Sequence, residues 1–196
     1  MTIGVLALQG DFKEHILKLS CMKVPAVEVR LPSDLTGLSG LILPGGETTT
    51  LRHLARSYGM IEPLREFGTS HALWGTCAGA IILANDLGGE PPVLGLMDMV
   101  VERNYFGRQV DSFEIDLEIP ALASRNHRSS ASVHAVFIRA PVIRSVGREV
   151  EVLARLPDGM IVAARQNRWL ATCFHPELTA DDRMHRLFLE MAESAP

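Results

Sequence analysis

The segment around Cys77 has residue types and spacing that can supply a nucleophile. Gly75-Thr76-Cys77-Ala78-Gly79 is a G-x-C-x-G sequence placed between an apolar run and a helical pattern. In such a strand-to-helix turn the nucleophile has a strained backbone, and small residues two positions away let strand and helix approach closely. Unpaired N–H groups at the helix start favour the thiolate, the nucleophilic form of cysteine. The alternative is a small core residue, because free cysteines are often buried.

A general base for this thiol is available in Phe174-His175-Pro176-Glu177, which directly follows an apolar run. His175 can accept the thiol proton and later protonate a leaving amine, while Glu177 can hold the imidazole in the productive tautomer. Taken singly, any one of the seven histidines is better interpreted as a surface residue. The pairing with Cys77 in an α/β pattern favours catalysis. We interpret the remaining histidines as structural or solvent-facing: His15, His53, His71, His127, His134 and His185.

A glycine-rich turn, Pro44-Gly45-Gly46-Glu47 followed by three threonines, comes between an expected strand and an expected helix. Backbone N–H groups in such a turn can point at an oxyanion, so Gly46 and Ala78 together can stabilise a tetrahedral intermediate. The alternative is an ordinary turn with Thr48 or Thr49 as the helix N-cap. The Walker spacing and the G-x-G-x-x-G fingerprint are both absent from the sequence, which disfavours nucleotide binding.

A second polar concentration runs from Glu102 to Phe113 and mixes charged, amide and aromatic side chains. Binding loops often have this composition. Arg103 in this run can bind a carboxylate.

The pattern of the first half predicts strands that alternate with crossover helices. We expect strands at 3–8, 26–30, 41–44 and 72–76, and helices at 12–21, 49–58, 62–67 and from residue 78 onward. This order is typical of a parallel sheet.

The second half of the chain has many strand-like segments and few helical ones. This pattern predicts an antiparallel or mixed edge of the sheet. Strand-like segments occur at 99–102, 113–119, 136–139, 150–156, 161–166 and 170–174. A last helix at about 181–193, capped by Thr179 or Asp181, should cover one sheet face. Residues 124–132 are interpreted as an exposed loop.

Composition excludes several classes of protein. A chain of 196 residues with 47% hydrophobic content fits one domain, residues 1–196. The net charge of −4 and the scattered basic residues do not suggest nucleic-acid binding. No apolar run approaches the roughly 20 residues of a membrane span, and the start of the chain does not resemble a signal peptide. The odd cysteine count, three, without metal-type spacing suits a reducing compartment, so we expect a cytoplasmic protein.

Together these motifs resemble the class I (triad) glutamine amidotransferases. Over nearly the whole chain the sequence is similar to the family of glutaminase subunits of pyridoxal 5'-phosphate synthase. The most specific runs are the one from Arg103 to Phe113 and Phe137-Ile138-Arg139-Ala140-Pro141, with Leu8-Gln9-Gly10 as a further match. The resemblance implies an α/β fold: a flavodoxin-like three-layer sandwich, with a mostly parallel central sheet, helices on both faces and some antiparallel strands.

The same resemblance implies site residues and partners. Cys77, His175 and Glu177 would be the triad, and Gln9 would lie near the oxyanion and the partner face. Glutamine would be bound by Gly46, Glu47, Thr48, Arg103, Ile138 and Arg139. Ammonia would be released as a cysteine thioester forms, and it would pass to a synthase subunit of (β/α)8 barrel type. The chain itself would need no cofactor and no metal. Two departures from the family are Thr48, where serine is usual, and a longer 124–132 loop.

Other functions stay open at this point. They are a glutaminase of another pathway, such as histidine or nucleotide biosynthesis, a related cysteine hydrolase acting on peptides, and a catalytically silent interaction module. The two specific runs argue against the first two, and the intact triad argues against the third.

Overall fold

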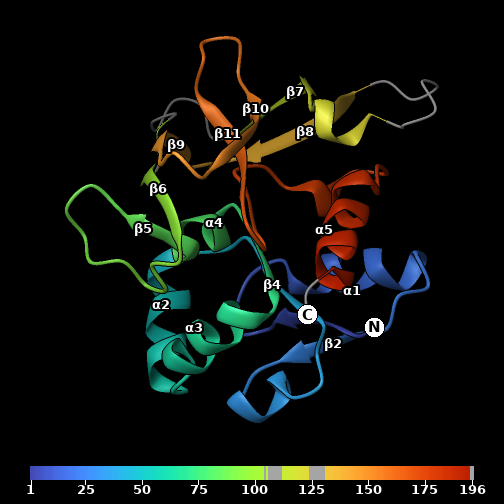
Figure 1. Ribbon diagram of the computed structural model, residues 1–196, viewed down its shortest axis with the longest axis vertical. Coiled ribbons are helices and arrows are strands. Elements are labelled where there is room, and N and C mark those ends of the chain that lie inside the picture. Colours follow the sequence, from blue (N-terminus) through green and yellow to red (C-terminus); the bar gives the residue numbers. More distant parts are fainter. Residues whose placement is uncertain (104, 106–111, 124–130, 195–196) are drawn as a thin grey trace.

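The computed structural model describes residues 1–103, 105, 112–123 and 131–194. The expectations for most of the run from Arg103 to Phe113 and for most of the 124–132 loop therefore lie outside the described residues. Figure 1 shows the chain arranged around one large sheet, with a smaller antiparallel sheet beside one end of it.

The first half of the chain forms a parallel sheet, as its pattern predicts. Strands β1 (Ile3–Leu6), β2 (Ala26–Val29), β3 (Gly40–Leu43) and β4 (Ala72–Thr76) lie side by side in the order β2-β1-β3-β4. Every residue of β1, β3 and β4 is buried. Continuous burial is expected when helices cover both faces of a parallel sheet.

Helices cover the two faces in separate groups. Helices α1 (Phe12–Cys21) and α5 (Arg183–Glu193) lie together on one face, where His15 contacts His185. Helices α2 (Thr48–Ser57), α3 (Ile61–Ser70) and α4 (Ala78–Leu83) lie on the other (Figure 1). The three-layer arrangement is confirmed. No described helix has the length and apolar character needed to cross a membrane.

The second half extends the sheet with mixed pairing. Strand β12 (Trp169–Thr172) is parallel to β4, and β11 (Ile161–Gln166), β9 (Val142–Val146) and β6 (Met97–Glu102) follow as antiparallel neighbours. Strand β10 (Glu151–Arg155) pairs with β11, and β5 (Ala84–Asp86) is parallel to β6. Strands β7 (Ser112–Glu118) and β8 (Ser132–Ile138) form the separate antiparallel sheet. The mostly parallel sheet with some antiparallel strands is thus confirmed.

Short elements account for the differences from the expected pattern. Strands β5 and β9 were not predicted, because β5 has only three residues and the apolar start of β9 is interrupted by Arg144 and Ser145. Three 3-10 turns, η1 (Pro32–Leu35), η2 (Pro120–Leu122) and η3 (Pro176–Leu178), each begin at a proline, whose fixed φ suits a first turn.

The cap of the last helix also differs from the prediction. The residue that precedes α5 is Asp182, and its side chain makes no capping hydrogen bond. The Asp181 carboxylate instead accepts a hydrogen bond from the Arg183 backbone N–H at 2.9 Å. Thr179 takes no part, because its hydroxyl donates to the Pro176 carbonyl.

Candidate active site

Cys77 occupies the sharp turn between β4 and α4. Its backbone has φ 47° and ψ −106°, a conformation that L residues adopt only under strain. A Cβ at Gly79 would lie 1.9 Å from the Leu43 carbonyl oxygen, and one at Gly75 would lie 2.4 Å from the Gly79 backbone. Only glycine fits at either position. The predicted strained turn, with room supplied by two glycines, is therefore confirmed.

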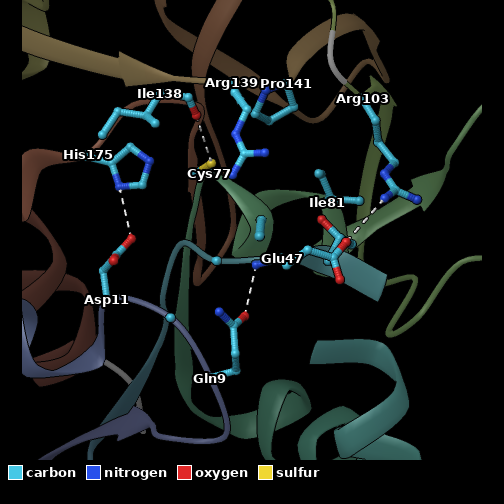
Figure 2. Close-up of a pocket in the computed structure, with 14 residues that line it drawn as sticks. Gln9, Asp11, Glu47, Cys77, Ile81, Arg103, Ile138, Arg139, Pro141 and His175 are labelled. Carbon is cyan, nitrogen blue, oxygen red and sulfur yellow. Dashed lines mark hydrogen bonds and ion pairs between the residues drawn. The ribbon is translucent and has the colours of Figure 1, made fainter. Parts of the chain in front are cut away.

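His175 lies between Cys77 and Glu177. Its backbone N–H donates to the Val136 carbonyl of β8 at 2.8 Å, which fixes the residue three positions after the end of β12. Its Nδ1 lies 2.7 Å from Glu177 Oε1, and the two side chains are 4% and 0% exposed. Figure 2 shows the ring facing Cys77. Because a carboxylate can only accept, Nδ1 carries the proton and Nε2 can accept one from the thiol.

The charges around His175 favour the protonated, charged form of its imidazole. Burial alone lowers the pKa of His175, but the neighbouring Cys77 and Glu177 outweigh burial and raise the pKa to about 10. Burial raises the pKa of Glu177, and the contact with His175 opposes that rise. The arrangement therefore suits an imidazolium held between Cys77 and the Glu177 carboxylate.

Two residues near the histidine were missed by the sequence patterns. Asp11 Oδ2 lies 3.5 Å from His175 Nδ1 on the solvent side, with 41% of its side chain exposed. Burial raises the pKa of Asp11, and the charge of His175 opposes that rise. On the inner side, His15 Nε2 lies 3.4 Å from Glu177 Oε2. The available signal was the spacing of Asp11 and His15, one helical turn apart, directly after Gln9-Gly10.

A cavity of about 430 Å³ opens in front of Cys77 and His175 (Figure 2). All eight further residues expected to contact glutamine, the oxyanion or the partner line it: Gln9, Gly46, Glu47, Thr48, Ala78, Arg103, Ile138 and Arg139. Gly10, Asp11, Ile81 and Pro141 line it as well, although no sequence pattern singled them out for this site. Glu177 lies behind His175 and does not line the cavity. The structure thus brings the expected site residues together.

Comparisons of the sequence and of the structure with known proteins point to the same family. The SNO glutamine amidotransferase family model matches residues 5–194. The chain belongs to this family. It is a glutamine amidotransferase, an enzyme that takes ammonia from the side-chain carboxamide of glutamine.

Relatives and a solved structure match over nearly the full length. The chain is 52% identical to a Roseiflexus castenholzii protein, covering 97% of this chain and 100% of that one. It is 55% identical to a Thermus thermophilus protein, covering 97% of each. Both relatives are named pyridoxal 5'-phosphate synthase subunit PdxT. A crystal structure of a glutamine amidotransferase matches with a TM-score of 0.89 and 53% identity, covering 97% of this chain and 98% of that one.

Glu47 of this glutamine amidotransferase caps helix α2. Its carboxylate oxygens accept hydrogen bonds from the backbone N–H groups of Thr49 at 2.9 Å and Thr50 at 2.7 Å. The possibility that Thr48 or Thr49 is the N-cap is therefore wrong, because the longer glutamate side chain reaches both free N–H groups. The Thr50 hydroxyl, followed by the two backbone N–H groups, lowers the pKa of Glu47 to about 2.

Gln9 ties the first strand end to the glycine-rich turn. Its Oε1 accepts a hydrogen bond from the Glu47 N–H at 2.8 Å. Beside it, a Cβ at Gly10 would lie 1.8 Å from the Gly45 carbonyl oxygen, so the two turns are in direct backbone contact. Gln9 therefore positions the turn that carries Gly46.

Arg103 lies at the rim of the cavity, where its guanidinium makes several long contacts with neighbouring side chains. Its guanidinium nitrogens lie 3.3 Å from both Glu90 carboxylate oxygens, 3.4 Å from the Thr49 hydroxyl and 3.9 Å from Glu47. Long, partly exposed contacts of this kind contribute little stability. An incoming carboxylate can therefore replace them.

Ligand atoms of Asp11, His175 and Glu177 lie within 4.8 Å of one another. His175 Nδ1 lies 2.7 Å from Glu177 and 3.5 Å from Asp11, which is the geometry of an imidazole N–H between two carboxylates. We therefore interpret this cluster as an orienting group for the imidazole and not as a metal site.

Proposed function

We propose that Cys77, His175 and Glu177 are the catalytic triad that hydrolyses glutamine to glutamate and ammonia. The observation that carries the proposal is the buried 2.7 Å contact between His175 Nδ1 and Glu177 Oε1, with the opposite side of the ring facing Cys77. This contact leaves His175 Nε2 as the atom that exchanges a proton with the sulfur. It is the arrangement that nucleophilic catalysis by cysteine requires.

The first half of the reaction forms a thioester. The Cys77 thiolate attacks the side-chain carbonyl carbon of glutamine, and the carbonyl oxygen becomes an oxyanion. The imidazolium of His175 gives the Nε2 proton to the nitrogen as the carbon–nitrogen bond breaks. Ammonia leaves, and a γ-glutamyl thioester remains on the sulfur.

The second half regenerates the enzyme. A water molecule enters after ammonia has left, and neutral His175 takes one of its protons as the oxygen attacks the thioester carbon. The carbon–sulfur bond breaks, glutamate leaves, and the thiolate and imidazolium pair is restored. The balance is glutamine and water to glutamate and ammonia.

The lining of the cavity supports the binding roles. Backbone N–H groups of Gly46 and Ala78 stabilise the oxyanion, and loss of one such donor typically costs about 2.7 to 4 kcal/mol of activation free energy. Arg103 binds the glutamine carboxylate in place of Glu90. Contacts from the cavity walls complete the binding of glutamine: Glu47, Thr48, Ile138 and Arg139.

The names of the relatives support a place in pyridoxal 5'-phosphate synthesis. The Roseiflexus and Thermus proteins are each named as a subunit of that synthase. We propose that residues 1–196 form one glutaminase domain that docks to a synthase subunit in the cytoplasm and supplies it with ammonia. Gln9 lies on the cavity wall, at the face that would meet this partner.

The test is glutamate release from glutamine by the purified chain, with and without the synthase subunit of the same source. Cys77→Ala should abolish release, and Cys21→Ala, which removes an exposed cysteine, should leave it unchanged. Activity that rises with the synthase subunit supports the whole proposal. Activity that survives in Cys77→Ala would refute the triad, and activity indifferent to the subunit would refute the partner.

A further inference from the structure

Only one of the two carboxylate oxygens of Glu177 contacts His175. The other, Oε2, faces a residue outside the proposed triad. Oε1 accepts from His175, while Oε2 is buried and makes no hydrogen bond to any described residue. His15 Nε2 lies 3.4 Å from Oε2, and both side chains are 0% exposed. A buried carboxylate oxygen without a donor is costly, so the atom that faces Oε2 matters.

His15 is in turn held by two other buried groups. Its Nδ1 lies 3.2 Å from His185 Nε2, and its Nε2 lies 3.3 Å from the Thr76 hydroxyl. Thr76 is the residue before Cys77, so one imidazole touches the elements that carry both the nucleophile and the carboxylate. Burial, followed by the charges of His185 and His175, keeps the pKa of His15 well below its usual value. His15 is therefore neutral and carries one proton.

The position of that proton follows from the partners. Burial lowers the pKa of His185 to about 3, so this ring is neutral as well. His185 Nδ1 is buried and makes no hydrogen bond with any described residue. If His185 Nδ1 has no proton, the only unpaired group is a weak acceptor. If His185 Nδ1 carries the proton, a buried N–H donor is unpaired and Nε2 has no proton to donate to His15. With the proton on Nε2, His185 donates to His15 Nδ1, and His15 must then carry its own proton on Nε2. That nitrogen lies 3.3 Å from the Thr76 hydroxyl and 3.4 Å from Glu177 Oε2.

We propose that His15 is a positioning residue for the triad, which donates from Nε2 to Glu177 Oε2 and is held in that tautomer by His185. The inference rests on the proposed function, because it acts through Glu177. The contact is long at 3.4 Å, and the Thr76 hydroxyl at 3.3 Å competes for the same nitrogen. Catalytic hydrogen bonds often tighten only in the substrate complex. The donated N–H favours the ionised carboxylate, which keeps the proton of His175 on Nδ1 and the Nε2 face toward Cys77.

Activity measurements separate this role from plain packing. His15→Leu removes the donor and keeps an apolar group of similar size, while His15→Gln places an amide N–H2 near the position of Nε2. We expect His15→Leu to lower kcat about 10- to 100-fold with little change in KM, the range for losing a buried hydrogen bond to a charged group. His15→Gln should recover most of that loss.

The pH profile gives a readout that packing alone would not change. Without the donor, the charged form of Glu177 is less stable, so the acid limb of kcat should move to higher pH in His15→Leu and stay in place in His15→Gln. The titratable groups facing Glu177 are His175, His15 and Asp11, and those facing His15 include His185. A loss of kcat without movement of the acid limb, or an equal loss when His15→Leu is added to Glu177→Gln, would overturn the inference.

A measurement on the unmutated chain covers the case in which His15→Leu does not fold. Nitrogen-15 NMR of the histidine rings should show His15 neutral at pH 7, with the proton on Nε2 and a bare Nδ1. A charged ring or the opposite tautomer would overturn the inference. The Cys77→Ala control separates the two claims: if it is inactive and both His15 variants are fully active, the triad stands and only the role of His15 fails.

Discussion

The two sides of His175 differ in burial and in charge. On the inner side, the Glu177 and His15 side chains are both 0% exposed and lie 3.4 Å apart. On the outer side, the cavity rim carries Glu47 and Glu90 with 52% and 46% of their side chains exposed. At the rim, two carboxylates, Glu47 and Glu90, share one arginine, Arg103, at 3.9 and 3.3 Å.

This difference indicates which part of the site has its final geometry before glutamine binds. Buried hydrogen-bonded groups are costly to rearrange, so the inner side holds His175 in one orientation at all times. Exposed ion pairs contribute about 0 to 1 kcal/mol, so the rim can exchange partners at little cost. Changes on the inner side should therefore affect kcat, and changes on the rim should affect KM.

The largest effect is expected from Glu177→Gln. The amide is uncharged, so it cannot stabilise the imidazolium, and its NH2 group can donate to Nδ1 and favour the wrong tautomer; kcat should therefore fall about 10³- to 10⁴-fold. Steady-state glutamate release checks this, with circular dichroism to show that the fold is kept. A loss below about tenfold would mean that the inner side does not set kcat.

The next largest effect is expected at Gly79, in the turn that carries Cys77. In Gly79→Ala the new Cβ would meet the Leu43 carbonyl oxygen, a backbone atom that cannot move aside. We expect loss of several kcal/mol of unfolding free energy, or no folded protein. The matched control is Gly88→Ala, which has open space and only a positive φ, with an expected loss of about 1 kcal/mol. Urea unfolding compares them, and equal losses would contradict the close approach.

On the rim, Arg103→Met should raise KM for glutamine about 10- to 100-fold and change kcat little. The reason is the loss of a charged hydrogen-bond donor, which contributes about 1.5 to 3 kcal/mol. Arg52→Met is the control, because Arg52 also pairs with Glu90 but does not line the cavity. A fall in kcat at constant KM would place Arg103 in the fixed part of the site.

The smallest effect is expected for the helix cap. Glu47→Ala should lower the unfolding free energy by about 1 kcal/mol at pH 7, and Glu66→Ala, an exposed position on α3, should have little effect. The pKa of Glu47 is lowered in the folded protein, so its contribution is complete above the ordinary value of 4.5 and is lost as pH falls through about 2. Unfolding at pH 7 and pH 2 tests this, since a difference that persists at pH 2 would exclude the carboxylate as its cause.

The sequence was most informative where chemistry depends on local spacing. The turn at Cys77 and the His175-Pro176-Glu177 run are short motifs, and the buried strands β1, β3 and β4 are continuous apolar runs. The order of these elements was enough to predict the parallel half of the sheet.

The inner contacts could not be found in this way. His15 reaches Glu177 only because α1 packs against η3, and it meets His185 only because α1 and α5 share a face of the sheet. These contacts join residues about 160 positions or more apart, and no local pattern in the chain signals them. The capping role of Glu47 was missed because glutamate is not among the usual N-cap residues.

The most direct test of the central claim is to trap the covalent intermediate. Turnover of glutamine in the presence of the synthase subunit is quenched with acid, and the digested chain is examined by tandem mass spectrometry. The account predicts one γ-glutamyl group on the peptide that carries Cys77, and none in Cys77→Ala. A γ-glutamyl group on Cys21 or Cys173 instead, or glutamate release that persists in Cys77→Ala, would contradict it.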